Sequence, residues 1–338
     1  MSGNYRRIVL AARPSGMPKD SDFRIEEVPI PEPAEGEVVV RNIFMSIDPY
    51  MRGRMREGPS YAPAVQLGEL MVGGTAGQVT ASRNGRFPEG VYVNGMLGWQ
   101  EYGVSDGTGL RQLDPAAAPI STSLGILGMP GMTAYFGLLD LGAPQEGETV
   151  AVTGAGGAVG ALVGQIAKIK GCRAVGLAGT DAKCTYAVDE VGFDACVNYK
   201  TAGDLQQAVA DACPKGVDVY FDNVGGPVAD AVILNLNEFS RVPVCGQIAL
   251  YNAEEPAMGP RLFFIFLTRR VKVQGFIVSD FAARWGEGLA QMTEWLQQGK
   301  LKYKEDIAQG IENAPQALIG VLQGANLGKQ LVQLSDAP

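Results

Sequence analysis

A glycine-rich loop is the feature that most constrains this chain. Residues 152–160 read VTGAGGAVG and place Gly154, Gly156, Gly157 and Gly160 within a short span. An apolar run precedes the loop, and GALVGQIAKIK after it has helical spacing. Glycines let a backbone turn tightly and approach a phosphate, and the following helix N-terminus offers N–H groups and partial positive charge. The loop predicts a dinucleotide site, with a merely tight strand–helix turn as the alternative.

The loop lies within a region where strands and helices alternate. Apolar strands are expected at 148–154, 172–179, 194–200, 217–225, 241–248 and 270–277, with helices at 157–171, 181–193, 204–213 and 227–236. Strands that are apolar on both faces and alternate with helices indicate a parallel sheet covered on both sides. The fold class is therefore α/β, and residues 125–280 form a doubly wound Rossmann domain. The spacing GxxGxxG departs from the strict GxGxxG motif, but its context is the expected one.

The flanking segments differ in character. Short strands with glycine turns at 35–47, 72–83 and 89–105 predict a β-rich N-terminal part. Residues 123–142 read as a helix pair broken by Pro130. The tail predicts a helix at 283–300, a strand near 304–307, a helix at 314–323 and a strand at 328–334.

Composition excludes several classes of chemistry. The sequence has no histidine, which removes Ser-His-Asp catalysis and most catalytic zinc sites. It has five cysteines without a CxxC motif, so they read as small buried residues, with neither a disulfide framework nor a metal site. The net charge of −8, without long blocks of one sign, argues against nucleic acid or an anionic membrane as a partner. The strongest apolar run, LFFIFL, is too short to span a bilayer, and a cytoplasmic protein is expected.

The residues at the end of the second strand of the doubly wound region distinguish an NAD site from an NADP site. An NAD site usually has Asp or Glu at this tip, whereas here the strand ends in Gly179 and Thr180. The small tip leaves room for a 2′-phosphate, to which Lys183 can supply charge and Tyr199 a hydroxyl. Asp181 is the counter-evidence, but its position suits a helix N-cap. The residues favour NADP(H), with a solvated helix lysine as the plain alternative for Lys183.

The motifs SIDPYMRGRM (46–55), LGMPGMTAY (127–135), FDNVGG (221–226), CGQIALYN (245–252) and GANLGKQLV (324–332) accompany the glycine loop. Together they resemble the zinc-independent medium-chain dehydrogenase/reductase superfamily, in the NADPH-dependent double-bond reductase branch of prostaglandin, alkenal and curcumin reductases. The resemblance covers nearly the whole chain. It implies a split β-rich, GroES-like catalytic domain (1–125 and 300–338) around a Rossmann NADP-binding domain (126–299), and a homodimer.

The resemblance also implies roles for particular residues. Gly157, Ala158 and Val159 match the pyrophosphate loop, between Gly154 and Gly160. Met132 and Thr133 match a turn near the nicotinamide. The remaining matches to cofactor-contacting positions are Asn223, Cys245, Tyr251, Phe276, Ile277, Val278 and Asn326. Arg52 belongs to the signature, without an assigned role.

The implied reaction is reduction of a carbon–carbon double bond conjugated to a carbonyl, on a small apolar substrate. It requires a hydrogen-bond donor for the enolate oxygen and a proton for the α-carbon. A tyrosine hydroxyl suits the first role, and the candidates are Tyr251, then Tyr61, then Tyr50; each could instead only order a loop. A pocket wall of Met129, Phe276 and Ile277 is expected. Alternatives are a quinone reductase of the same superfamily and an NADPH-binding protein without turnover. No YxxxK motif supports a short-chain dehydrogenase.

Overall fold

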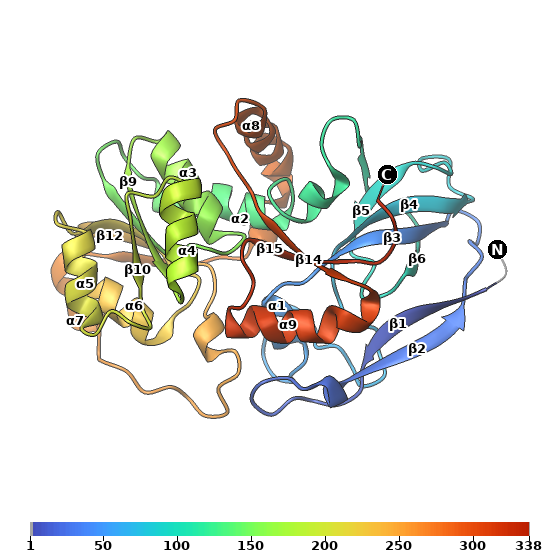
Figure 1. Ribbon diagram of the computed structural model, residues 1–338, viewed down its shortest axis with the longest axis horizontal. Helices are drawn as coiled ribbons and strands as arrows, with labels where there is room; N and C mark the ends of the chain where they lie inside the picture. The colour runs from blue at the N-terminus through green and yellow to red at the C-terminus, as the bar shows by residue number, and fades with distance from the viewer. Residues whose placement is uncertain (1–2, 338) are drawn as a thin grey trace. The chain divides into compact units, whose positions relative to one another are not determined.

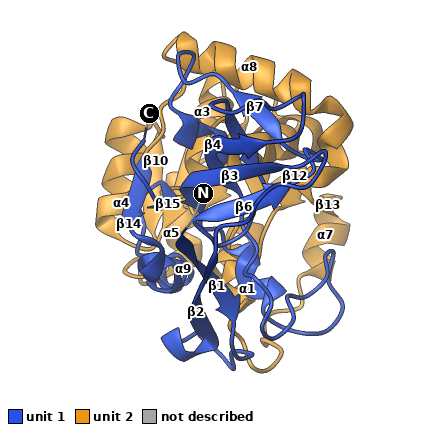
Figure 2. Ribbon diagram, turned by 90° about the vertical axis from the view of Figure 1, so that its right-hand side faces the viewer, with its two compact units in different colours: residues 1–125, 305–338 blue, residues 126–304 orange. Residues whose placement is uncertain are grey.

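The computed structural model describes residues 3–337 and divides the chain into two compact units. Unit 1 comprises the chain up to Gly125 together with Glu305 onward, and unit 2 comprises Ile126–Lys304 (Figure 2). The last strand of unit 1 thus returns to a sheet begun some 280 residues earlier in the sequence: Leu331 pairs with Ser46.

A six-stranded parallel sheet forms the centre of unit 2. Its order is β10-β9-β8-β11-β12-β13, and every neighbouring pair is parallel. The strands are β8 (Thr149–Thr153), β9 (Arg173–Ala178), β10 (Ala195–Asn198), β11 (Val217–Phe221), β12 (Leu236–Val244) and β13 (Lys272–Gly275). The direction of strand order reverses between β8 and β11, and the crevice at the carboxyl ends of such strands is where ligands bind in doubly wound sheets.

Helices cover this sheet on both faces (Figure 1). They are α2 (Met129–Phe136), α3 (Gly160–Ile169), α4 (Asp181–Thr185), α5 (Leu205–Ala212), α6 (Gly226–Ile233), α7 (Phe263–Arg269) and α8 (Trp285–Gln297). One apolar core joins strand residues such as Val175 and Tyr220 to Val209 of α5 and Val232 of α6. Strand β8 is buried at every residue, as expected for a central strand of a parallel sheet covered on both faces.

Unit 1 contains a seven-stranded sheet and a hairpin. The sheet comprises β3 (Val38–Ser46), β4 (Thr75–Ser82), β5 (Tyr92–Gly95), β6 (Tyr102–Ser105), β7 (Arg111–Leu113), β14 (Glu305–Gln309) and β15 (Lys329–Gln333). The hairpin pairs β1 (Asn4–Leu10) with β2 (Phe23–Pro29), and the helices are α1 (Tyr50–Arg54) and α9 (Ala314–Gln323). Trp99, fully buried, stacks on Phe23 within an apolar core of this unit.

The fold class is confirmed, whereas the expectations for Pro130 and Asp181 are wrong. Pro130 does not break a helix pair: it lies in the first turn of α2, where proline needs no N–H partner, and the helix continues into a wider turn over Gly137–Gly142. Asp181 is not an N-cap, because Thr180 holds that position and its hydroxyl oxygen accepts the N–H of Lys183 at 3.3 Å. No helix within residues 3–337 has the length and apolar character to cross a membrane.

Candidate active site

The glycine loop connects the end of β8 to the start of α3. Gly154 has φ 70°, a conformation that side chains disfavour, and a Cβ on Gly160 would lie 2.2 Å from the carbonyl oxygen of Gly154. The loop is held by Gly157 N–H donating to Gly154 O and by Ala155 N–H donating to Leu177 O of β9. This close backbone packing places Ala158 and Val159 directly before the first turn of α3, whose early N–H groups project from the helix N-terminus.

The tip of β9 gathers the residues predicted to hold a 2′-phosphate. The side chain of Lys183 lies across the loop, since a Cβ on Gly156 would be 2.9 Å from Lys183 Cγ. The hydroxyl of Tyr199 lies against Gly179, 2.7 Å from the position of a Cβ there. Burial raises the pKa of Tyr199, which therefore stays a neutral donor at pH 7. The structure brings Lys183, Tyr199, Gly179 and Thr180 together beside the loop.

Two further residues complete this tip. Asp181 turns toward β10, where its Oδ1 accepts Nδ2–H of Asn198 at 2.7 Å. The Asp181 carboxylate, which was the sequence evidence against NADP(H), is therefore hydrogen-bonded to a neighbouring amide. Lys200, which the sequence reasoning missed, also reaches Gly179, with Cε 3.3 Å from the Cβ position. Its place directly after Tyr199 was the available signal.

A buried carboxylate, Asp222, organises the switch point and was also missed. It is 3% exposed, and its Oδ1 accepts hydrogen bonds from Tyr220 Oη (2.7 Å) and Thr153 Oγ1 (3.1 Å). The same oxygen accepts the backbone N–H groups of Val224 and Gly225, and Oδ2 accepts Gln247 Nε2–H at 2.6 Å. These bonds tie the ends of β8, β11 and β12 together. The motif FDNVGG contained Asp222, but a strand-end carboxylate gives no sequence signal that distinguishes an internal hub from an exposed group.

Asn223 follows the hub into the loop after β11. Its Nδ2–H donates to Thr153 O at 2.7 Å, and its N–H donates to Thr153 Oγ1 at 2.9 Å. Asn223 is therefore fixed beside the end of β8, next to the glycine loop: a Cβ on Gly154 would lie 3.7 Å from Asn223 Cβ.

Tyr251 places its hydroxyl at the carboxyl end of β12. The Gln247 N–H donates to Tyr251 Oη at 3.4 Å. A Cβ on Gly246 would be 3.3 Å from this oxygen and 3.1 Å from Asn223 O, so the hydroxyl and the Asn223 loop flank the same glycine. Cys245 precedes them, with its N–H donating to Asp222 O at 2.8 Å. Burial and the Asp222 charge raise the pKa of Cys245 to about 12, so its thiol is protonated at pH 7 and is no nucleophile.

The other two candidate tyrosines lie in unit 1. Tyr50 begins α1, and burial, with Asp48 and Tyr61 adding to it, raises the pKa of its hydroxyl. Tyr61 is 60% exposed in the loop that follows. The two tyrosines interact with each other electrostatically. Arg52 on the same helix is buried and donates to Gly16 O at 2.9 Å, so its described contacts order the N-terminal loop.

Met132 and Thr133 do not form a turn. Both lie within α2, because the helix begins at Met129, earlier than the broken pattern suggested. Met132 is fully buried, with its sulfur 2.8 Å from the position of a Cβ on Gly288 of α8, and Thr133 Oγ1 donates to Met129 O at 2.7 Å. In this structure these side chains pack the helix; any contact of theirs with a cofactor stays a prediction.

Phe276, Ile277 and Val278 follow β13, as the resemblance implied. Phe276 N–H donates to Val244 O at 3.4 Å, and its ring lies edge-on to Phe221 with centroids 6.1 Å apart. Ile277 N–H donates to Asp280 Oδ2 at 3.2 Å. Asn326 lies in unit 1, where its Nδ2–H donates to Gly328 O at 2.8 Å. Contacts of these four residues with a cofactor stay predictions.

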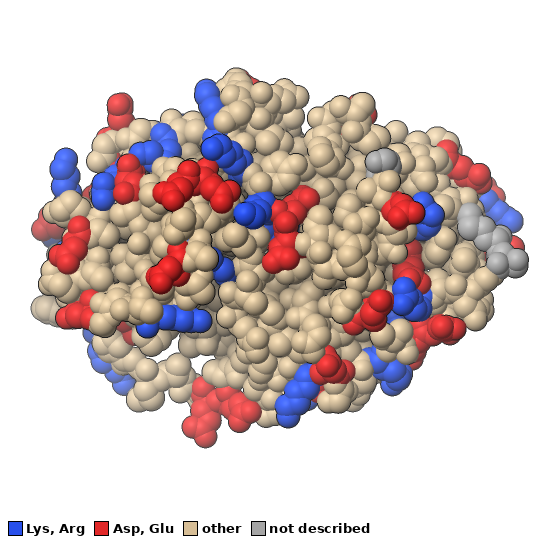
Figure 3. Space-filling view, in the orientation of Figure 1, with Lys and Arg blue, Asp and Glu red and all other residues tan. Residues whose placement is uncertain are grey.

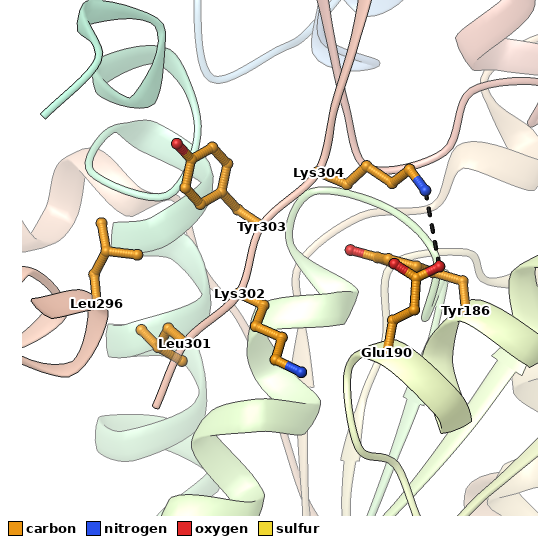
Figure 4. A pocket seen from close by; sticks show the side chains of 7 residues that line it. All are labelled: Tyr186, Glu190, Leu296, Leu301, Lys302, Tyr303 and Lys304. Carbon is orange, nitrogen blue, oxygen red and sulfur yellow. Dashed lines mark ion pairs between the residues drawn. The ribbon is translucent and has the colours of Figure 1, made fainter. Parts of the chain in front are cut away.

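Unit 2 has a surface pocket of about 430 Å³, and none of the site residues described above lines it (Figure 4). Lys304 Nζ and Glu190 Oε1 are 3.9 Å apart at its edge, and the ammonium lies 5.3 Å from the Tyr186 ring centroid. The lining residues are Tyr186, Glu190, Leu296, Leu301, Lys302, Tyr303 and Lys304. None of them is a predicted site residue, and the pocket is not assigned to the site.

Comparison with known proteins gives the family. The family described as "N-terminal domain of oxidoreductase" matches residues 6–113, and that described as "Zinc-binding dehydrogenase" matches residues 158–295. The chain is 48% identical to NADPH-dependent curcumin reductase of Escherichia coli (strain K12), over 98% of this chain and 97% of that protein. It is 42% identical to prostaglandin reductase 1 of Rattus norvegicus, over 94% and 95% of the two chains.

A solved structure agrees with these relatives. The crystal structure of CurA in complex with NADPH from Vibrio vulnificus has a TM-score of 0.93 and 48% identity, and the match covers 98% of this chain and 99% of that one. Similarity of this extent includes both units and the segments that connect them. The chain therefore belongs to the medium-chain dehydrogenase/reductase superfamily, in its double-bond reductase branch.

Proposed function

We propose that this protein reduces the carbon–carbon double bond of α,β-unsaturated ketones and aldehydes with NADPH. The observation that carries the proposal is the cluster at the tip of β9, where Lys183 and Tyr199 adjoin a glycine loop and Asp181 is turned to Asn198. The names of the relatives, curcumin reductase and prostaglandin reductase, support the same class of reaction.

The residues at the switch point fit NADPH. The backbone turn at Gly154–Gly160 would hold a pyrophosphate at the N-terminus of α3, because glycines allow the backbone to approach a phosphate closely. Lys183, with Lys200 beside the same tip, would neutralise the 2′-phosphate, and Tyr199 would donate a hydrogen bond to it. When bound, NADPH supplies the hydride that the β-carbon of the substrate receives.

The protein's part in the chemistry is to hold a donor where negative charge develops. As the β-carbon becomes saturated, the substrate carbonyl oxygen gains enolate character and needs a hydrogen bond. We assign this bond to the Tyr251 hydroxyl, whose position is fixed by Gln247 and, through Gln247, by Asp222. A phenol has an ordinary pKa near 10, so it donates while protonated at pH 7. Tyr61 and Tyr50 are the next candidates.

We propose that no zinc takes part. The sequence has no histidine, and within the described chain no group of three or more Cys, Asp or Glu side chains could hold a metal ion. Zinc sites are built from Cys, His and carboxylate ligands, so the donor set for one is missing from residues 3–337.

We further propose a cytoplasmic homodimer in which a second copy pairs with β13. This strand ends the sheet order and all four of its residues are exposed. The α7–β13 surface, defined by Phe239, Phe263, Phe264, Leu267 and Val273, exposes 44–83% of each of these apolar residues. An exposed strand edge can pair with a strand of another chain. In a pair related by a two-fold axis, the same apolar surface of each copy would be buried in the interface. On the face drawn in Figure 3, charges of both signs are interspersed, which supports neither a nucleic acid nor a membrane as partner.

A test of the function measures NADPH oxidation by the loss of its absorbance with a linear enone, a trans-alkenal, curcumin and a benzoquinone. We expect turnover with the enones and alkenals, and much slower turnover when NADH replaces NADPH. Product analysis should show a saturated ketone or aldehyde, not an alcohol. Turnover with the benzoquinone alone would make the protein a quinone reductase, and NADPH binding without any turnover would remove the enzyme assignment.

A further inference from the structure

Two cysteines that are twelve positions apart in the sequence meet beside the proposed 2′-phosphate site. Cys184 lies on α4 and Cys196 on β10, and their sulfur atoms are 2.8 Å apart, with Cys196 donating to Cys184. Both residues are half-buried, unlike the fully buried Cys172 and Cys213. This corrects the expectation that all five cysteines are small buried residues: Cys184, Cys196 and Cys245 are half-buried.

The pair differs chemically from the buried cysteines. The hydrogen bond from Cys196 holds the pKa of Cys184 below its usual value, while the pKa of Cys196 is raised by that same bond and by burial. By contrast, burial raises the pKa of Cys172 and of Cys213 to about 11. The thiolate is the reactive form of cysteine, so Cys184 is the favoured nucleophile and Cys196 the resolving partner.

The location of the pair couples it to the cofactor site. Cys184 directly follows Lys183, and Cys196 lies three positions before Tyr199. Beneath them, a Cβ on Gly176 would be 3.2 Å from Cys196 Sγ and 2.7 Å from Cβ of Ala155 in the glycine loop. Any change in the separation of the two sulfurs therefore acts on the helix that carries Lys183 and on the strand that leads to Tyr199.

We propose that Cys184 and Cys196 are an oxidation site, at which a hydroperoxide closes them into a disulfide that weakens NADPH binding. The disulfide itself is independent of the proposed function, whereas its effect on NADPH rests on it.

The oxidation balances in two steps. The Cys184 thiolate attacks one oxygen of hydrogen peroxide, the O–O bond breaks, and the hydroxide that leaves takes up a proton, which gives a sulfenic acid and water. The Cys196 thiol then attacks the sulfenic sulfur, the S–O bond breaks, and the hydroxyl leaves as a second water with the thiol proton. Two thiols are oxidised by two electrons and one peroxide is reduced to two waters. A dithiol reductant reverses the reaction by exchange.

The effect of the disulfide on NADPH binding depends on whether α4 or β10 moves when the bond forms. A disulfide requires the sulfurs to approach to about 2.05 Å. Neither α4 nor β10 has a buried residue, but β10 is hydrogen-bonded to β9 in the sheet, so we expect the helix to move. Lys183 moves with α4, and its side chain shifts relative to Gly156 and the phosphate that it would contact. We expect the KM for NADPH to rise about three- to tenfold, the scale of a weakened charge-assisted hydrogen bond, with kcat little changed.

The test treats the full-length reduced enzyme with hydrogen peroxide and then reads two quantities. Mass spectrometry of the intact chain and its peptides should show loss of two hydrogens and a Cys184–Cys196 link, and kinetics should show the higher KM for NADPH, restored by dithiothreitol. The variants Cys184→Ser and Cys196→Ser should keep the untreated KM after peroxide. Cys172→Ser is the matched control, since serine can keep the bond of that thiol to Gln145 O, and it should respond as the wild type does.

Each contrary result has its own meaning. Absence of the link overturns the proposal whatever the enzyme's activity, because the mass measurement needs no turnover. A link that leaves the KM and the direct binding of NADPH unchanged overturns the coupling. A rise in KM that persists in Cys184→Ser assigns the effect to another residue. Failure of the untreated protein to oxidise NADPH with every acceptor contradicts the proposed function instead.

Discussion

At the scale of single residues, Lys183 is half-buried across the glycine loop, and we propose that its charge favours NADPH over NADH. Lys183→Ala removes one cation from the 2′-phosphate contact but leaves the pyrophosphate loop intact. We expect the KM for NADPH to rise about tenfold or more, since a hydrogen bond to a charged group contributes about 1.5–3 kcal/mol, while the KM for NADH changes little. Steady-state kinetics with both cofactors measures the difference.

The matched control for this change is Lys170→Ala, at the opposite end of α3. This variant should leave the KM for NADPH and the KM for NADH unchanged. If Lys183→Ala raised the KM for NADPH and the KM for NADH equally, the lysine would support the loop and would not recognise a 2′-phosphate.

Tyr251 is a second residue whose role can be separated from folding. Tyr251→Phe removes only the hydroxyl near Gly246. We expect kcat for enone reduction to fall about 100-fold, the usual loss for a donor that stabilises developing oxyanion charge, with the KM for NADPH unchanged. An unchanged kcat would assign the donor to Tyr61 or Tyr50, and Tyr61→Phe is then the next variant.

At the scale of elements, a buried ion pair holds β15 to the segment after β3. Lys329 Nζ lies 3.1 Å from Asp48 Oδ1 and donates to Ile47 O at 2.7 Å; both side chains are nearly inaccessible. Ser46 Oγ donates to the other carboxylate oxygen. Burial lowers the pKa of Lys329, and the Asp48 charge opposes this shift. The pair connects segments that are about 280 residues apart.

Lys329→Met leaves Asp48 buried without its cation. We expect the free energy of unfolding to fall by about 3–5 kcal/mol, the usual cost of breaking a buried pair from one side. Urea unfolding followed by circular dichroism measures it. Lys302→Met, an exposed lysine, is the control and should change stability by less than about 0.5 kcal/mol. A similar small effect at Lys329 would contradict a contribution of the pair to stability.

At the scale of the whole molecule, a substitution on the α7–β13 surface tests whether this surface forms the proposed dimer interface. Arg270 lies 4.4 Å over the Phe239 ring, so a cation already borders the apolar residues there. Phe264→Glu places a charge where a second copy would have to bury it. We expect the wild type to sediment as a dimer and the variant as a monomer. Leu67→Glu, at another exposed apolar residue, which lies in unit 1, should remain dimeric. A monomeric wild type would contradict the proposed dimer.

The order of elements and the place of the glycine loop between a strand and a helix were readable from the sequence alone. Apolar runs and helical spacing are local, so they located all six strands of the parallel sheet and the helix Ala314–Gln323. Glycine spacing, the absence of histidine and a strand tip without a carboxylate are likewise properties of the chain itself. They sufficed to favour NADP(H) and to exclude histidine-based catalysis.

Only the tertiary structure decided which distant groups meet. Asp222 became a hub because parallel pairing brings the ends of β8, β11 and β12 to one edge. Cys184 and Cys196 came into contact because α4 packs beside β10, a relation that no CxxC spacing encodes. Local patterns arise from neighbours along the chain, whereas these contacts depend on strand register and helix packing, which only the folded molecule determines.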